Sequence, residues 1–489
     1  VKPARPVQDK IVILDSFDCG VYLKRKLFIR HEDRSVSLYD EDKLLDIDLA
    51  ITVDNIPARA KFWWEFPESD LRDFLSKALG LRALYPVFTG TARYEQIGLQ
   101  DEQGKTRVFC EIVSLFSPDR PRTPLMRQLK LEPVTGYDED YQQALELVTN
   151  IGAFEPTLKP LDSLLRAIGI VPRPYDVKPK LSLTPDASAR SSVSSIIKTM
   201  MVKQRQTEEG IIKDIDTEFL HHFRVALRMV RAAIAQLKEV FPQQDVMTLK
   251  QRFDSIGRET NLLRDLDVFI LDKERYMSLL PASLQEGLLP MFDDFEQSRS
   301  KEVKRISRWL SSRAYKSEIE ELQSLFEHGY SALETEWSER PTIKLAVNKI
   351  QKRYKKIQKA AAKITHDTPD NDIHDIRIDC KKLRYLLYFF GNLFNKKQVK
   401  IAGNHLKSLQ DTLGIFNDLS VQGEFLEGYL DKVEHKAKKD VLLIASLGGL
   451  IATLNNLQKQ ERDNCIRQLA FFSNKENRAL FKDTFVIES

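Results

Sequence analysis

The sequence has little cysteine, and what it has is scattered. Its 489 residues include four cysteines, Cys19, Cys110, Cys380 and Cys465, with no CxxC pair among them. Neither a disulfide framework nor a thiolate zinc site is therefore expected. This usage fits a reducing, cytoplasmic setting, and the first residues lack the apolar stretch and cleavage site of an export signal.

Long hydrophobic runs and a large net charge are also lacking. The longest apolar run, residues 441 to 454, is shorter than the ~20 residues that span a bilayer, so it predicts a buried helix. The net charge is only +4, although 30% of the residues are charged. Any site for an anion must therefore come from local clustering of charge.

Signatures of common catalytic sites are missing as well. The chain has no glycine-rich phosphate loop of the Walker type, no GxSxG and no cluster of His and Cys. We therefore predict no catalytic residues, no metal ligands and no cofactor. Binding is expected instead of catalysis.

Periodicity divides the chain into regions of different structure. Up to residue 117, segments such as "KIVILDSF", "KRKLFIRH" and "KFWWEF" predict an antiparallel sheet or barrel. Residues 118–186 are rich in proline and predict a connector with two short helices. From residue 187 to 487 nearly every segment has helical period. The expected fold is multidomain α+β, with a β-rich domain at 1–117 and an all-α domain at 187–487.

The segment "HDIRIDCKKLRY", residues 374–385, places a stripe of positive charge on one predicted helix. At ~100° per residue, four side chains fall within an arc of about 80°. They are His374, Arg377, Lys381 and Arg384, and Lys382 lies beside them. A solvated helix face is the plain interpretation of such a run. Like charges so close are nevertheless unfavourable unless acids or an anionic ligand neutralise them.

The same pattern occurs earlier, in "HHFRVALRMVR", residues 221–231. Its cations and histidine precede their counterparts by 153 residues, and they are His221, Arg224, Arg228 and Arg231. The same offset relates "RDLDV" to "NDLSV", so Asp265 corresponds to Asp418, and it relates Lys203 to Lys356. Two copies of one unit, at about 187–335 and 340–487, favour a functional stripe over chance surface charge.

These motifs resemble the CHAD family, the conserved histidine α-helical domain, over about residues 187–487. "HDIRIDCKKLRY" and "LQDTLGIFNDL" carry the resemblance in the second copy. It implies a pair of pseudo-symmetric four-helix bundles whose basic helices face each other across a groove or pore that binds inorganic polyphosphate. The first copy departs from the pattern, because Met229 stands where the family often has another Arg and the "LQ" and "LG" are missing.

Polyphosphate is a flexible polyanion with no base to recognise, so its complement is a row of Arg and Lys with few aromatics. The stripe and the resemblance together give the expected phosphate-binding residues. These are His221, Arg224, Arg228, Arg231, Lys203, His374, Arg377, Lys381, Lys382, Arg384, Lys356, Arg353 and Lys407.

Two histidines and two acids within the repeats have other candidate roles. His221 and His374 are able to donate to phosphate, to bind a metal or to pack at the start of a helix. A metal is least favoured, because neighbouring guanidinium groups repel a divalent cation. Asp265 and Asp418 are expected to orient arginines by hydrogen bonding and not to act as catalytic bases.

The N-terminal region has a partial resemblance to the CYTH or triphosphate-tunnel family. That family implies an antiparallel β-tunnel in which basic residues bind triphosphate and glutamates bind a metal. The matching positions are Asp15, Asp18, Arg30, Arg93 and Glu111. The family's Glu-x-Glu-x-Lys strand is absent from "VKPARPVQDKIVI", so too few carboxylates remain for two-metal catalysis. We expect a degenerate tunnel-like domain, with Trp63 and Trp64 as core or rim aromatics.

Three alternatives remain beside non-catalytic polyphosphate binding. A nucleic-acid-binding module would also use cationic helices, but the stripe lacks interleaved aromatics and no groove-reading motif occurs. A helical protein that binds only other proteins would explain the helices but not the repeated cations. A triphosphatase in the N-terminal domain is the third. No membrane partner is expected, protein partners are unknown, and a polyphosphate granule is a candidate location.

Overall fold

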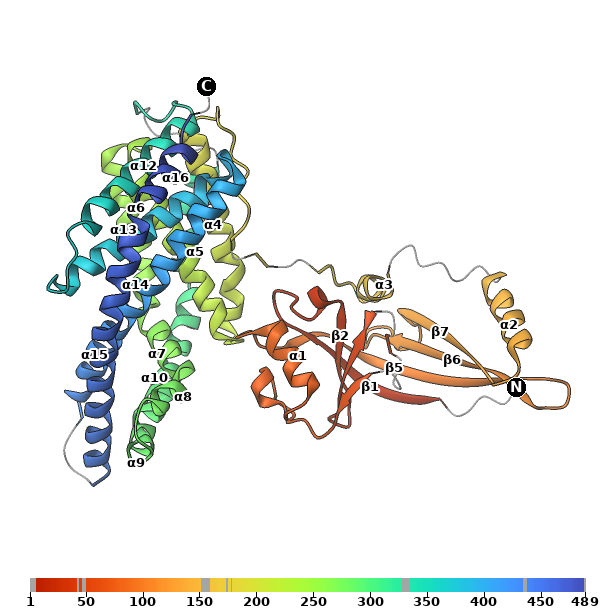
Figure 1. Cartoon of the computed structure of the whole chain (residues 1–489). Coiled ribbons are helices and arrows are strands. Elements are labelled where there is room, and N and C mark those ends of the chain that lie inside the picture. Colours follow the sequence, from red (N-terminus) through yellow and green to blue (C-terminus); the bar gives the residue numbers. More distant parts are fainter. Residues whose placement is uncertain are drawn as a thin grey trace. The chain divides into compact units, whose positions relative to one another are not determined.

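The chain forms two compact units, Val1–Asp176 and Val177–Ser489, in a computed structural model (Figure 1). The structure describes residues 6–41, 44–45, 50–150, 159–172, 175–176, 178–327, 335–433 and 438–487, with only the backbone for 438–440. The first unit is built on an antiparallel sheet and the second is all α. This confirms the predicted class, a multidomain α+β protein with a β domain followed by a helical domain.

One seven-stranded antiparallel sheet organises the first unit, in the order β4-β3-β2-β1-β5-β6-β7. Its strands are β1 (Val7–Asp15), β2 (Lys26–Arg30), β3 (Val36–Asp40), β4 (Ile51–Val53), β5 (Tyr85–Gln100), β6 (Thr106–Phe116) and β7 (Met126–Pro133). β7 lies in the stretch that the sequence suggested as a connector. The edge strands β4 and β7 do not pair with each other within the described residues. Gln128 of β7 nevertheless donates to the Leu44 carbonyl (2.8 Å), so the sheet curls and its two edges approach.

Apolar cores cover both faces of this sheet, because alternate side chains of a strand point to opposite sides. On one face, Ile11 and Ile29 pack against Leu164 of α3 (Pro160–Ala167). On the other, Phe28 and Leu38 belong to a cluster with residues of α1 (Asp70–Leu79). α2 (Asp138–Asn150) contacts β6 and β7.

The helical unit contains the two copies that the repeat predicts, joined in one fold (Figure 1). The first copy consists of α4 (Ala189–Ile212), α5 (Thr217–Gln236), α6 (Gln243–Glu259), α7 (Asn261–Leu271), α8 (Lys273–Ser278), α9 (Ala282–Gln285), α10 (Leu289–Ser311) and α11 (Arg313–Glu327). The second consists of α12 (Thr342–Ala361), α13 (Asp370–Phe390), α14 (Lys396–Leu430), α15 (Lys438–Phe472) and α16 (Lys475–Thr484). The basic segments fall on α5 and α13.

The starts of the two copies pair reciprocally. The backbone N–H of Ala189 donates to Arg340 O (2.9 Å), and the N–H of its counterpart Thr342 donates to Ala187 O (2.8 Å). Between these bonds, Ser188 forms an antiparallel bridge with its own counterpart, Pro341. The two hydrogen bonds therefore join equivalent positions of the two copies in opposite directions. Such reciprocity is what a pseudo-twofold axis between the copies produces.

The two copies also share a hydrophobic core. Side chains of α7, α8 and α10 pack with side chains of α14 and α15. Phe269 of the first copy stacks on Phe425 of the second, with ring centroids 4.4 Å apart, and Leu447 and Leu450 are fully buried in the same cluster. At this end the copies form a common bundle and not two separate ones.

One segment of the described chain, Val441–Phe472 in α15, is long and apolar enough to cross a membrane, judged by length and composition alone. A buried core helix can also be this long and this apolar. Here Leu443, Leu447, Leu450 and Leu454 point into the shared core, whereas Val441 is 67% exposed.

A cationic site between the two copies

The basic helices α5 and α13 contact each other. Arg228 of α5 lies close enough to Arg377 and Lys381 of α13 for its charge to depress both of their pKa values, adding to the effect of burial. Lys381 is the counterpart of Arg228 in the repeat. The pseudo-twofold axis therefore brings equivalent cations together, and the two stripes form one site. We call Arg224, Arg228, Arg377, Lys381 and Arg384 the central cations.

Burial shapes the charge of the central cations. It lowers the pKa of Lys381 to about 8, with Arg377 and Arg228 adding to the effect. In the same way burial and then Arg228 lower the pKa of Arg224 to about 10. The arginine therefore stays charged at neutral pH, while the lysine is close to its titration range. Among the described residues, Arg228, Lys381 and Arg384 form no ion pair with an acid.

Two equivalent arginines are held by different acceptors. Nη1 of Arg224 donates to the Gly257 carbonyl (3.1 Å) and to the Thr260 hydroxyl (2.7 Å), at the break between α6 and α7. Nη2 of Arg377 donates to Asp418 Oδ1 (3.0 Å), on the continuous helix α14. Asp418 thus makes the contact expected of an orienting acid.

Asp265, the counterpart of Asp418, acts on arginines through its charge. Loss of hydration raises its pKa, and Arg224 and Arg264 oppose that rise. Arg264 was not among the predicted site residues, although it opens the "RDLDV" motif. One of its Nη atoms and Nε of Arg377 are buried without a hydrogen-bond acceptor in the described part of the chain. Buried donors of this kind are rare in proteins.

The two equivalent histidines, His221 and His374, differ as well. Burial, and then the charge of Arg264, lower the pKa of His221 to about 3, so His221 is neutral at physiological pH. Nδ1 of His374 is hydrogen-bonded to Oδ1 of Asn417, which is the counterpart of Arg264. Where the structure describes the chain, no group of three or more His, Cys, Asp or Glu side chains could hold a metal ion.

At the outer end of the stripe the copies diverge in charge. Arg231 forms an ion pair with Asp254 of α6. Its counterpart Arg384 is exposed, and the position equivalent to Asp254 is Lys407, also exposed, on α14. The second copy therefore presents two cations where the first presents a neutralised pair.

Three other predicted cations gather around a different acid, Asp379, which is only 4% exposed. Arg353 and Lys356 of α12 approach it at 2.6 and 2.9 Å, and Lys382 at 3.9 Å. The helical pattern did not identify this cluster, although Asp379 precedes Lys382 by one helical turn. Lys203, the counterpart of Lys356, is half-buried on α4.

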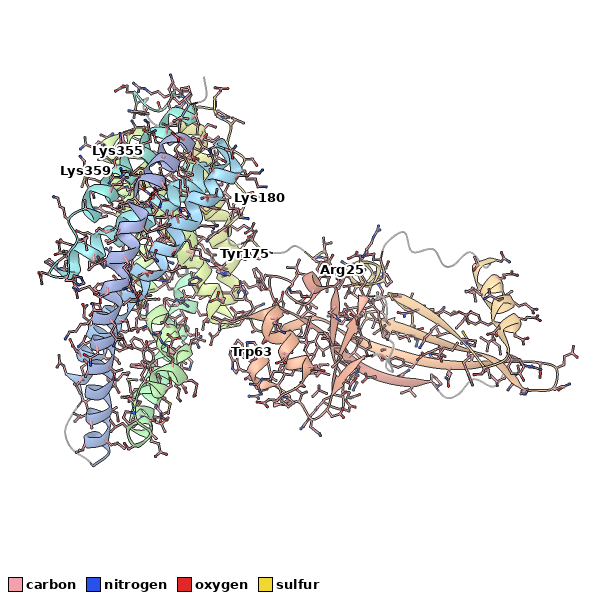
Figure 2. The ribbon with its side chains drawn as sticks, in the orientation of Figure 1. Arg25, Trp63, Tyr175, Lys180, Lys355 and Lys359 are labelled. Atoms are coloured by element: carbon pink, nitrogen blue, oxygen red, sulfur yellow. The ribbon has the colours of Figure 1, made fainter. Side chains whose placement is uncertain are left out.

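Beside this cluster, a cavity of about 480 Å³ lies between α12 and α13. It is lined by Lys356 and Lys359 from one helix and by Asp372, Asp375 and Asp379 from the other, and Lys359 is marked in Figure 2. Its charge is mixed, in contrast to the central cations.

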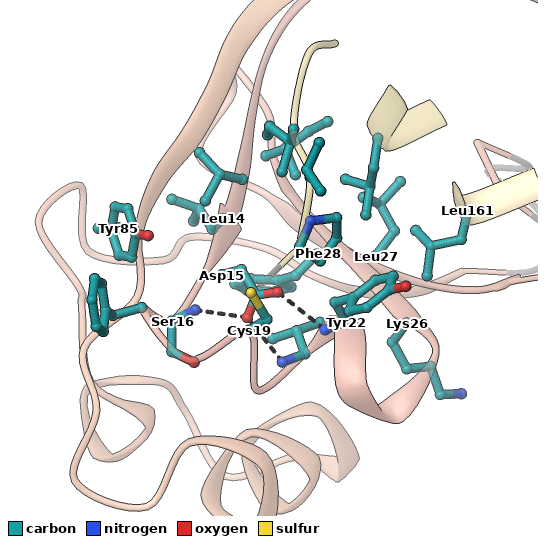
Figure 3. A pocket seen from close by; sticks show the side chains of 18 residues that line it. Leu14, Asp15, Ser16, Cys19, Tyr22, Lys26, Leu27, Phe28, Tyr85 and Leu161 are labelled. Atoms are coloured by element: carbon teal, nitrogen blue, oxygen red, sulfur yellow. Dashed lines mark hydrogen bonds between the residues drawn. The ribbon is translucent and has the colours of Figure 1, made fainter. Parts of the chain in front are cut away.

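The positions that suggested a triphosphate tunnel are used for local structure. Asp15 accepts hydrogen bonds from the backbone N–H groups of Ser16, Val21 and Tyr22 (Figure 3), and burial raises its pKa to about 6. Arg30 donates to the carbonyls of Ala58 and Ala60.

Two further tunnel positions, Arg93 and Asp18, also have local partners, and the last, Glu111 of β6, lies opposite Lys130 of β7 in the sheet. Arg93 pairs with Glu95 at 2.7 Å, and Asp18 accepts from the Ser16 hydroxyl. The Trp63 indole, marked in Figure 2, donates to Gly80 O (2.9 Å), and Trp64 is 38% exposed.

Fold and site together define a helical, internally repeated domain with a cationic centre. Residues 196–427 match the family model of the CHAD domain, so the helical unit of this chain is a CHAD domain. Its fold resembles the crystal structure of the CHAD domain from the plant Ricinus communis, with a TM-score of 0.51 and 22% identity over 60% of this chain and 95% of that one.

A second solved structure, PptA from Streptomyces chartreusis, aligns at a TM-score of 0.43 and 12% identity, over 58% of this chain and 99% of that chain. No curated protein sequence matches the chain.

Proposed function

We propose that the CHAD domain of this protein binds inorganic polyphosphate, without cleaving it, at the central cations. The observation that carries the proposal is the meeting of Arg228 with Arg377 and Lys381 across the two copies. Like charges brought together under partial burial are unfavourable in the free protein. A polyanion that contacts all of them would relieve this repulsion.

The chemistry of the site favours phosphate over other anions. Guanidinium groups meet two phosphate oxygens at once, and successive phosphates of a chain repeat the same contact along both stripes. Arg228 and Arg384 are exposed and Arg377 is half-buried, so the site offers both an accessible entrance and partly dehydrated contacts. The cysteine usage makes the cytoplasm our proposed location for this binding.

A double substitution at equivalent positions tests the proposal. Replacing Arg228→Ala and Lys381→Ala removes one cation from each copy, and neither side chain has an ion-pair partner among the described residues to leave stranded. Each charge-assisted contact contributes roughly 1.5–3 kcal/mol. We expect on the order of a hundredfold weaker binding or more, measured by titration calorimetry with polyphosphate of defined length.

The matched control removes the same charge elsewhere. Arg275→Ala with Lys213→Ala takes two cations from α8 and from the residue after α4. Among the described residues, each of them pairs with an acid on the same stretch of chain, Asp272 and Glu209 respectively. This variant should bind as the unchanged protein does. Equal losses in both double variants would mean that net charge, and not the central cations, determines binding.

The β domain is not proposed to hydrolyse triphosphate. Asp15, Arg30 and Arg93 are committed to backbone groups or neighbouring acids. Two-metal cleavage needs carboxylates grouped closely enough to hold metal ions, and the described residues include no such group of three or more. Phosphate release from tripolyphosphate with Mg²⁺ or Mn²⁺ should therefore stay at the level of a buffer blank. Release that disappears in Glu111→Gln would contradict this expectation.

A further inference from the structure

Three side chains of the β domain form a continuous hydrogen-bonded chain. Oδ2 of Asp9 lies 2.6 Å from Nδ1 of His31, and Nε2 of His31 lies 2.8 Å from Oγ of Ser37. A carboxylate only accepts, so Nδ1 donates to Asp9, and in the neutral imidazole Nε2 is then the acceptor for the Ser37 hydroxyl. This is the order of groups in which an acid orients an imidazole and the imidazole activates a hydroxyl.

The fold holds these groups on three neighbouring strands. Asp9 is in β1, His31 directly follows β2, and Ser37 is in β3. A tight turn closes the hairpin between β2 and β3, where His31 N donates to Ser35 O (2.9 Å) and Arg34 has a φ of 70°. Backbone pairing and the turn thus fix the imidazole relative to the hydroxyl, as a preorganised site requires.

All three side chains line one cavity of about 700 Å³. Ser37 is 2% exposed and the His31 side chain 10%, so the pair is largely withdrawn from bulk water but reaches this space. A cavity of this volume accommodates a small organic molecule.

Two other residues that carry a hydroxyl, Thr52 and Tyr94, line the same cavity. Oγ1 of Thr52, on β4 opposite Ser37, lies 3.1 Å from the Ser37 oxygen. The Tyr94 hydroxyl is buried with no hydrogen-bond partner among the described residues. Burial raises the pKa of Tyr94, so the phenol keeps its proton and is able to donate. Such donors stabilise the negative charge that develops on a carbonyl oxygen during acyl transfer.

The charge of the cavity indicates the kind of substrate. Its lining includes acids and no Lys or Arg in the part of the chain that the structure describes, the acids being Asp9, Glu32, Asp33, Asp54 and Glu111. Glu32 is paired with Lys10 at 2.8 Å, so the negative charge of the lining comes mainly from the other acids. An anionic substrate such as a phosphate would be repelled, whereas an organic cation would be attracted.

We propose that Ser37 is the nucleophile of an esterase site in the β domain, with esters of cationic alcohols as its substrate class. Oγ of Ser37 bonds to the acyl carbon while its proton passes to Nε2 of His31. The bond from the acyl carbon to the alcohol oxygen breaks, and the alcohol leaves with the proton from His31. Water then adds to the acyl group with His31 as base, which releases the acid and restores Ser37.

In this reaction one ester and one water give one acid and one alcohol. Asp9 is a positioning residue, because it acts only through His31. The activity is independent of polyphosphate binding by the CHAD domain, so either proposal stands if the other fails.

Labelling of the full chain with a fluorophosphonate probe tests the nucleophile. Ser37 should carry the label, found by peptide mass spectrometry, and Ser37→Ala should carry none. His31→Ala should label roughly 10²–10⁴ times more slowly, the usual contribution of a general base. The matched control is Ser76→Ala, a serine of α1 outside this cavity whose hydroxyl donates to the Asp73 carbonyl of its own helix, and it should label at the unchanged rate.

Hydrolysis of two isosteric acetates tests the substrate class. The acetate ester of choline should give a kcat/KM at least tenfold above that of uncharged 3,3-dimethylbutyl acetate. Asp54→Asn should lower the ratio of these two kcat/KM values, because it removes a negative charge from the cavity lining. With the uncharged ester, Asp9→Asn should lower kcat and leave KM unchanged, since the change misorients the base and this substrate carries no charge for Asp9 to attract. Absence of label on Ser37, or label that His31→Ala does not slow in a variant with unchanged circular dichroism, would overturn the proposal.

Discussion

Both copies of the CHAD domain carry the same row of cations, but nearby acids neutralise the row to a different extent in each copy. In the first copy, Arg231 is neutralised by Asp254. In the second, Arg384 has no ion-pair partner among the described residues, and Lys407 stands at the position equivalent to Asp254. The two copies thus keep cations at the same positions, while most of the positive charge that no acid neutralises lies in the second copy. We infer that the second copy makes the stronger phosphate contacts.

The two copies also hold their equivalent arginines, Arg224 and Arg377, through different hydrogen-bond acceptors. The first copy breaks its helix at Thr260, between α6 and α7, which frees a carbonyl and a hydroxyl to accept from Arg224. The second copy has Leu413 at that position within the continuous helix α14. Leucine cannot accept, so Arg377 turns to Asp418 instead.

Removing matched pairs of cations from each copy should show the largest difference. Lys381→Ala with Arg384→Ala removes two unpaired cations, whereas Arg228→Ala with Arg231→Ala removes one unpaired cation and one that Asp254 already neutralises. The second-copy variant should lose roughly 1.5–3 kcal/mol more polyphosphate affinity, the value of one charge-assisted contact. Equal losses in calorimetry would remove the basis for an asymmetric site.

Exchanging the residues that distinguish the copies should shift affinity in opposite directions. Asp254→Lys frees Arg231 and adds a cation, so binding should tighten and the slope of log K against log salt should steepen by about one to two units. Lys407→Asp should weaken binding and flatten the slope, because Arg384 then gains an acid. A salt series measured by fluorescence anisotropy checks both, and slopes that stay the same would contradict the assignment of Lys407 to the site.

The pH dependence should come from the second copy. Lys381 has a pKa lowered to about 8 in the free protein, and a bound polyanion raises that pKa. Affinity should therefore be full below pH 8 and decrease as the pH rises above it, with proton uptake on binding. Lys381→Arg should remove this decrease, since arginine stays protonated. Calorimetry in buffers of different ionisation enthalpy measures the uptake, and none at pH 8 would contradict the prediction.

The smallest effect should follow from exchanging the helix-break residue. Thr260 is fully buried, so the test is Thr260→Val, which removes the hydroxyl that accepts from Arg224 and nearly keeps the side-chain volume. The domain should lose about 1 kcal/mol of unfolding free energy. The matched control is Thr412→Val, because the Thr412 hydroxyl bonds the Ser408 carbonyl within its own helix. Denaturant unfolding compares the two.

The sequence predicts the helical half well because its signals are local. The period of apolar residues determines which face of α5 and of α13 is buried, and the repeat offset identifies equivalent residues. The grouping of cations was less predictable. Arg353, Lys356 and Lys382 surround Asp379 because α12 packs beside α13, and a pattern within one helix does not reveal its neighbour.

In the β domain, even fewer of the contacts between polar side chains could be predicted from the sequence. Its strands follow from alternation, but the roles of its polar residues depend on pairing between distant strands. Asp15 matched a tunnel position, yet it accepts from the turn that follows it. His31 and Ser37 gave no sequence signal, because their partner Asp9 lies on another strand.

The central claim is that the central cations form a polyphosphate site, and one measurement tests it most directly. Binding of the full chain to polyphosphate, ATP, single-stranded DNA and RNA should be measured in parallel at one salt concentration, with the variant carrying Arg228→Ala and Lys381→Ala beside it. We predict that polyphosphate binds most tightly by at least tenfold and that the double substitution abolishes this preference. Equal or tighter binding of DNA or RNA, or a preference that survives the substitution in a folded variant, would contradict the claim.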